Sequence, residues 1–69
     1  MDTELKIRAY KLLRKHQFVS EEEFDDLFKE RDGKVFGRLY AHEPLIEIDV
    51  EAGTISFDDF PDGKFTIAV

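Results

Sequence analysis

The 69-residue chain is 42% hydrophobic and 13% aromatic, which suits one small domain with a packed core and excludes a disordered segment. It has no cysteine, so neither a disulfide framework nor a thiolate zinc site can form. Its net charge of -6 argues against non-specific binding to nucleic acid or to an anionic membrane. With no leader pattern at the start and no apolar run of about 18 residues, we expect one cytoplasmic domain over residues 1–69.

Residues 3–16 have the pattern of an amphipathic helix. Apolar side chains recur at helical spacing and predict the side that faces the core, together with one histidine: Leu5, Ala9, Leu12, Leu13 and His16. Either Asp2 or Thr3 can cap the first turn. Acidic residues lie at the start of this segment and basic residues toward its end, which matches the helix dipole.

A second helix is predicted over residues 20–31. Ser20 and Glu23 have the spacing of a capping box, in which each side chain binds the backbone amide of the other residue. Gly33 supplies a stop at the far end. The side predicted to be buried consists of Phe24, Leu27 and Phe28.

A short third helix is predicted over residues 34–42. Its apolar residues follow the spacing of one helical face: Val35, Phe36, Leu39 and Tyr40. Gly37 weakens this helix by about 1 kcal/mol relative to alanine. Pro44 ends the segment, because the residue before a proline disfavours helical backbone angles.

Residues 45–69 alternate between apolar and polar side chains, as β-strands do. The alternating apolar residues are Ile46, Ile48, Val50, Ile55, Phe57, Phe65, Ile67 and Val69. Gly53 and residues 61–63, which contain proline, aspartate and glycine, mark two turns. The segment therefore reads as three short strands.

These strands are predicted to pair as an antiparallel meander. Placing Phe57 opposite Ile67, and Ile55 opposite Val69, puts the alternating apolar residues on one face. The sequence thus predicts an α+β fold, with two or three N-terminal helices packed on a C-terminal three-stranded antiparallel meander.

The predicted order of elements resembles a winged-helix domain. In that comparison residues 20–31 form the second helix, residues 34–42 the recognition helix and residues 45–57 the winged hairpin. The resemblance covers residues 3–57 and implies a domain that binds DNA or, as in many members of the class, another protein. Glu51 stands at the presumed wing tip, where a DNA-binding member usually presents Lys or Arg, and this favours protein.

Three basic side chains are candidates for contact with nucleic acid. Lys34, Arg38 and His42 are spaced four residues apart and would share one face of the predicted third helix. In a major groove, Lys or Arg on such a face can read guanine. An ordinary solvated helix face explains the same spacing, and three bases on an acidic protein neutralise few phosphates.

A second stripe on the predicted first helix carries apolar and basic side chains away from the core: Ile7, Tyr10, Lys11 and Arg14. An exposed apolar anchor flanked by cations is typical of a protein-binding surface, because aromatic and Arg side chains dominate hot spots. The alternative is that the sheet or a second copy of the chain covers this side of the helix.

The remaining residues form no recognisable catalytic or metal site. The sequence has no nucleophile motif, phosphate-binding glycine loop or dinucleotide fingerprint, its two histidines have no partners at ligand spacing, and we expect no cofactor. We therefore expect a non-enzymatic protein-binding module, such as an adaptor, regulator or small inhibitory protein, that binds another protein or itself. The alternatives are a winged-helix DNA-binding regulator that uses residues 34–42, and a small subunit of an obligate oligomer.

Overall fold

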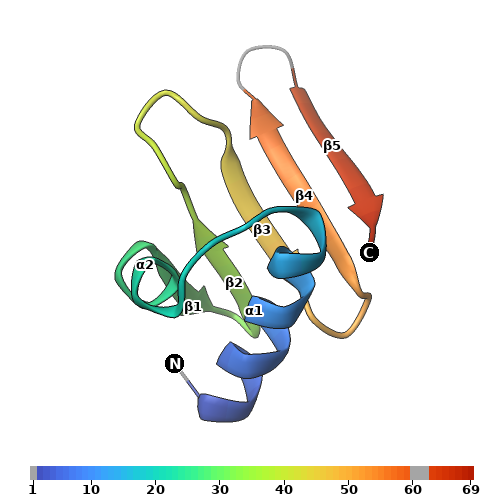
Figure 1. Ribbon diagram of the computed structural model, residues 1–69. Helices are drawn as coiled ribbons and strands as arrows, with labels where there is room; N and C mark the ends of the chain where they lie inside the picture. The colour runs from blue at the N-terminus through green and yellow to red at the C-terminus, as the bar shows by residue number, and fades with distance from the viewer. Residues whose placement is uncertain (1, 60–62) are drawn as a thin grey trace.

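The computed structural model describes residues 2–59 and 63–69. Two helices come first, α1 (Thr3–His16) and α2 (Glu21–Leu27) (Figure 1). Neither of these described helices is long and apolar enough to cross a membrane. Five strands follow and form one antiparallel sheet in chain order: β1 (Phe28–Arg31), β2 (Lys34–Gly37), β3 (Leu45–Asp49), β4 (Thr54–Asp59) and β5 (Gly63–Ala68).

Three local signals in the sequence are confirmed. The Asp2 carboxylate caps α1 by accepting a hydrogen bond from the Glu4 amide at 2.9 Å. Ser20 caps α2, because its hydroxyl accepts from the Glu23 amide while the Glu23 carboxylate accepts from the Ser20 amide. Gly53, with a φ of 69°, lies in the turn between β3 and β4.

The second helix is shorter than predicted and leads directly into a strand. The helix ends at Leu27, and β1 pairs antiparallel with β2. Asp32 and Gly33 connect the two strands with φ values of 54° and 78°, the left-handed backbone that a two-residue hairpin turn of this type requires. Gly33 therefore closes a β-hairpin and does not cap a helix.

The predicted third helix over residues 34–42 is wrong. Its first four residues form β2, and the chain from 38 to 44 is an irregular connection to β3. Val35 and Gly37 are buried, whereas Lys34 and Phe36, which alternate with them, are only partly buried, and this is the alternation of a strand. A short apolar run is compatible with the period of a helix and with that of a strand. This run is a strand because it pairs with a neighbouring strand on each side. The winged-helix resemblance thereby loses the element that it assigned as recognition helix.

The predicted three-stranded meander is also wrong, because the sheet contains five strands in the order β1-β2-β3-β4-β5. The register predicted for its last two strands is wrong as well. Phe57 pairs with Phe65, and Ile55 pairs with Ile67. Each partner lies two residues from the predicted one, and such a shift keeps every side chain on its face, so alternation could not distinguish the two registers. Residues 61 and 62 of the predicted second turn lie outside the described residues.

The core lies between the helices and one face of the sheet. α1 packs against β3 and β4, and α2 packs beside β1 (Figure 1). Within the described chain the core consists of Ala9, Leu13, Val19, Phe24, Phe28, Val35, Ile46, Ile48, Val50, Ile55 and Phe57. The opposite face of the sheet carries mainly polar side chains, so the molecule has two layers, helix and sheet.

Candidate functional site

The outward side of α1 and the segment after it carry two exposed apolar side chains. Ile7 on α1 has 47% of its surface exposed, and Phe18 in the connection to α2 has 77% exposed. Tyr10, Lys11 and Arg14 lie between them in the chain. We call these five residues the α1 surface.

Tyr10 belongs to this surface and is also held by the fold. Its hydroxyl donates a hydrogen bond to the Val19 carbonyl oxygen at 2.7 Å. Its ring meets the ring of Phe24 edge-on, with the centroids 5.4 Å apart. The expectation that the core does not need Tyr10 is therefore wrong, since this half-buried side chain fastens α1 to the start of α2.

Arg14 connects Tyr10 to Phe18. Its Nη1 donates to the Tyr10 hydroxyl at 3.2 Å, and its guanidinium carbon lies 4.6 Å from the centroid of the Phe18 ring. A guanidinium over an aromatic face is attracted by the negative face of the ring. The surface therefore presents an aromatic ring and a cation side by side.

Phe18 is absent from the candidates that the sequence suggested, although a signal for it exists. Gln17 and Ser20 both have extended backbone angles, so neighbouring side chains between the helices point to opposite sides. Val19 stands just before the capping residue, a position whose apolar side chain packs inward onto the helix. Because Val19 is buried at 2% exposure, Phe18 faces solvent.

Part of the α1 surface borders a hollow, and the helix that carries it is basic. A hollow of about 190 Å³ lies between α1 and the start of α2 and is lined by Lys6, Ile7, Tyr10, Lys11 and Glu21. α1 contains five Lys and Arg residues against one Glu, a net charge of +4, although the whole chain carries -6. The ion pair between Lys6 and Asp25, at 2.5 Å, joins α1 to the acidic helix α2 beside this hollow.

The structure separates Lys34, Arg38 and His42, which the predicted helix had placed on one face. Lys34 is on β2, and its ammonium lies 3.2 Å from the Glu47 carboxylate. Arg38 and His42 are exposed in the connection from β2 to β3, where His42 stacks on Tyr40 with the ring centroids 6.0 Å apart. These three bases therefore do not form one recognition surface.

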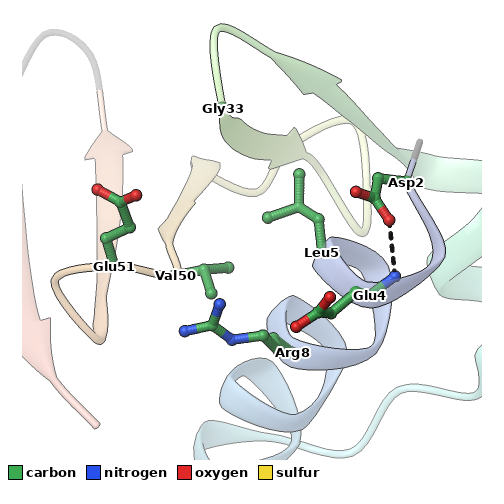
Figure 2. A pocket seen from close by; sticks show the side chains of 7 residues that line it. All are labelled: Asp2, Glu4, Leu5, Arg8, Gly33, Val50 and Glu51. Carbon is green, nitrogen blue, oxygen red and sulfur yellow. Dashed lines mark hydrogen bonds between the residues drawn. The ribbon is translucent and has the colours of Figure 1, made fainter.

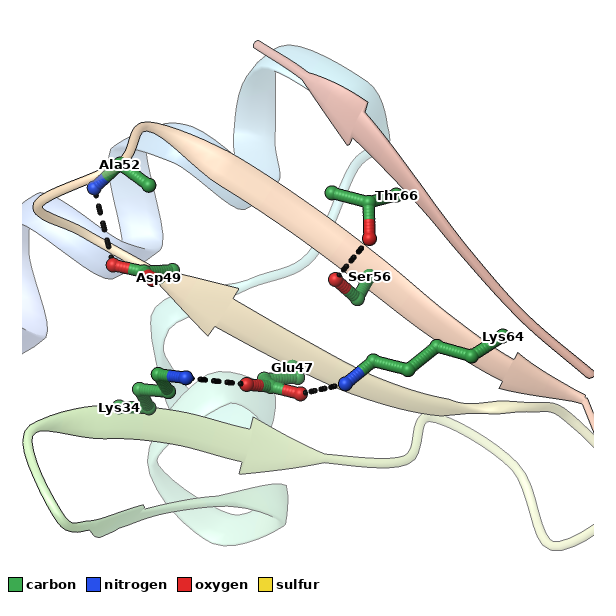
Figure 3. A network of polar contacts seen from close by, with 7 residues as sticks. All are labelled: Lys34, Glu47, Asp49, Ala52, Ser56, Lys64 and Thr66. Carbon is green, nitrogen blue, oxygen red and sulfur yellow. Dashed lines mark hydrogen bonds and ion pairs between the residues drawn. The ribbon is translucent and has the colours of Figure 1, made fainter.

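Glu47 lies on the sheet face opposite α1, between two lysines (Figure 3). Its carboxylate accepts a hydrogen bond from Lys64 at 2.6 Å and lies within ion-pair distance of Lys34, and only 15% of its side chain is exposed. The Lys64 hydrogen bond lowers the pKa of Glu47 below 4.5, and the same contact raises the pKa of Lys64 above 10.5. The network links β2, β3 and β5, so we assign it a structural role.

A larger hollow, of about 320 Å³, opens beside the start of α1 (Figure 2). Its lining carries charges of both signs: Asp2, Glu4, Leu5, Arg8, Gly33, Val50 and Glu51. The Asp2 carboxylate is already engaged in capping α1. The described residues contain no group of three or more His, Cys, Asp or Glu side chains placed to hold a metal ion. Such a mixed lining selects no class of ligand.

The α1 surface combines exposed apolar groups, an aromatic–guanidinium pair and positive charge in one place. Comparison of the chain with protein-family models, with curated proteins and with solved structures finds no match. Evidence for function therefore comes from this surface and from the charge distribution of the chain.

Proposed function

We propose that this chain is a non-enzymatic protein-binding module whose α1 surface docks on an acidic protein. The observation that carries this proposal is the exposure of Ile7 and Phe18 beside the cations Lys11 and Arg14. An interface needs an apolar anchor that loses its water and a polar rim around it, and aromatic and Arg side chains supply much of the energy in known hot spots.

The exposed Phe18 side chain contributes little to the packing of the fold. The core position next to it is filled by Val19, and the described contact of the Phe18 ring is with the exposed guanidinium of Arg14. Burial of such a side chain against a partner would contribute about 1.5–3 kcal/mol relative to its exposure to water. The guanidinium would remain at the rim, where it can donate hydrogen bonds to a carboxylate of the partner.

Charge decides the kind of partner. The net charge of α1 is +4, so an acidic protein surface would be attracted to it and a basic one repelled. Nucleic acid would be attracted to the same helix, but the net charge of -6 on the whole chain opposes a long polyanion more than a compact acidic patch. Attraction between exposed charges weakens as salt screens them, so binding should weaken with ionic strength.

The test compares the wild-type chain with Ile7→Ser/Phe18→Ser in affinity capture from native lysate, with and without nuclease treatment. Tyr40→Ser is the matched control, because Tyr40 is an exposed aromatic (60%) outside the α1 surface. Captured proteins are then purified and their affinities for each variant measured by calorimetry at low and high salt. We expect an acidic protein that binds the wild type and the Tyr40→Ser variant, and that loses affinity for the double variant and at high salt.

Two results would overturn the proposal. Equal affinity of the purified partner for wild type and for the double variant would place the docking site elsewhere. Capture that disappears after nuclease treatment would show that nucleic acid, and not an acidic protein, mediates the binding. Circular dichroism of the double variant must match that of the wild type, which we expect because both substituted side chains are exposed.

A further inference from the structure

β5 forms the edge of the sheet opposite β1, and among the described strands it pairs only with β4 (Figure 1). α1 lies over β3 and β4, so the face of the sheet beside β5 is covered less. Phe65 of β5 has 56% of its surface exposed although it stacks on the buried Phe57, with ring centroids 5.1 Å apart. The core therefore continues outward onto an apolar strip along the edge strand.

The backbone of β5 can accept another strand. The Val69 amide donates to the Gly53 carbonyl at 3.1 Å, which identifies this pair as hydrogen-bonded. Hydrogen-bonded pairs alternate along an antiparallel ladder, so Ile55 with Ile67 is the next such pair. On β5, the residues that alternate with these hydrogen-bonded ones direct their amide and carbonyl groups away from β4. On this alternation the outward-facing backbone groups belong to Lys64, Thr66 and Ala68.

We propose that β5 pairs antiparallel with β5 of a second copy of this chain, about a two-fold axis at Thr66. In this register Thr66 faces Thr66, and Lys64 of one copy faces Ala68 of the other. All three outward-facing backbone positions then find partners, and the two sheets join into one. Phe65 of each copy lies opposite Ile67 of the other, on the face that carries α1, and the cross-strand pairs extend the apolar strip across the axis.

A second copy suits this edge because β5 complements itself. Lys64 is the one charged residue within β5, and the two-fold register sets it against an alanine, so like charges do not meet across the new ladder. Its ammonium is already bound by Glu47 at 2.6 Å and is directed inward along the sheet. A lysine on an edge strand often prevents such pairing, but here it is held away from the edge.

The charge of the chain gives the association a distinctive salt response. Each copy carries -6, so two copies repel one another and screening should strengthen the dimer. Binding of an acidic protein to the α1 surface should respond in the opposite direction. The two interactions can therefore be distinguished in one set of buffers, and neither depends on the other.

The test measures self-association by sedimentation velocity over a range of protein concentrations for the wild type, Thr66→Lys and Thr66→Glu. Each variant sets two like charges face to face at the axis, which should raise the dissociation constant about fivefold. An equimolar mixture of the two variants sets opposite charges face to face and should restore a heterodimer. Both variants lose the same hydrogen bond between the hydroxyls of Ser56 and Thr66. This loss is therefore equal in each variant alone and in their mixture, and it does not affect the comparison of their dissociation constants.

Ala68→Pro provides a second variant that leaves side-chain charge unchanged. The substitution removes the amide N–H of Ala68, which faces outward from an extended strand. An edge strand tolerates proline at such a position, because this N–H is not used within the sheet. Since each dimer would lose two hydrogen bonds, the dissociation constant should rise at least about tenfold. Phe18→Ser is the control and should leave self-association unchanged, because it lies on the other surface.

Three outcomes would overturn the inference. A wild-type chain that stays monomeric at millimolar concentration would exclude the dimer. A dimer that Ala68→Pro does not weaken would use another surface. A mixture of Thr66→Lys and Thr66→Glu that forms no heterodimer would exclude the two-fold register, provided that both variants keep the wild-type circular dichroism spectrum.

Discussion

The ring of Phe28 on β1 lies directly against the backbone of Gly37, its paired residue on β2. A β-carbon on Gly37 would collide with two carbons of that ring and would lie 2.7 Å from the Leu27 carbonyl oxygen. The ring cannot move aside easily, because it is buried and stacked on the ring of Phe24 at a centroid distance of 4.9 Å. Glycine is therefore required in the strand for a packing reason.

Replacement of Gly37 by alanine should lower the free energy of unfolding by about 1–3 kcal/mol, the usual cost of overpacking a core. Alanine would gain about 0.5–1 kcal/mol in strand propensity, which the collision exceeds. Urea denaturation measures the difference. In a Phe28→Leu background the same substitution should cost less, because the ring is gone. An equal cost in both backgrounds would show that Phe28 is not the cause.

The turn between β1 and β2 was predictable from the sequence, and Gly37 explains why the helical interpretation failed there. Asp32-Gly33 is a strong signal for a two-residue hairpin turn, but the residues on its two sides do not alternate between apolar and polar, and Gly33 alone also resembles a helix stop. A glycine inside an apolar run is as consistent with a strand whose backbone is closely approached by another group as it is with a weak helix. The neighbour is Phe28, and only the fold brings it there.

The strands after Pro44 were predictable in position but not in register, since a shift of two residues preserves the buried face. The candidate site was predictable in part. Helical spacing placed Ile7 outside the core, whereas the bond from Tyr10 to the Val19 carbonyl depends on how the two helices meet. Phe18 could have been found from the position of Val19 before the helix cap.

Tyr10→Phe should lower the free energy of unfolding by about 1 kcal/mol, because the Val19 carbonyl oxygen loses its 2.7 Å hydrogen bond while the ring keeps its contact with Phe24. Tyr10→Ala should cost more, about 3 kcal/mol, since the ring contact is lost too. Thermal and urea denaturation check both values. If the two variants were equally stable, the ring would contribute nothing to the core.

Ser20→Ala should destabilise the protein by about 1 kcal/mol, because α2 has only seven residues and its first turn depends on the capping box. Ser20→Asn is the matched control, since the asparagine side chain can also accept a hydrogen bond from the Glu23 amide. Denaturation midpoints of the three proteins provide the measurement. An alanine variant as stable as the wild type would mean that the cap is replaced by water at no cost.

Glu47→Gln should reduce stability near neutral pH and should remove part of its dependence on pH. The Lys64 hydrogen bond lowers the pKa of Glu47 in the folded state, so the stabilisation is present above 4.5 and is lost as the pH falls through the lowered value. The pKa of Lys64 is raised, so its contribution is present below 10.5 and is lost as the pH rises through the raised value. Wild type and variant should therefore differ most between these limits and converge outside them.

The measurement is urea denaturation of both proteins across the pH range, with Glu51→Gln as the control for the loss of an exposed carboxylate. Glu51 lies in the turn after β3, and its side chain is exposed, so its removal should shift the whole stability curve little. In acid the stability curves of wild type and Glu47→Gln should converge, because protonated glutamate and glutamine are both neutral. Near neutral pH they should differ, because glutamine cannot form an ion pair with either lysine. Parallel curves for wild type and Glu47→Gln at every pH would mean that the network of Lys34, Glu47 and Lys64 is too well solvated to stabilise the sheet.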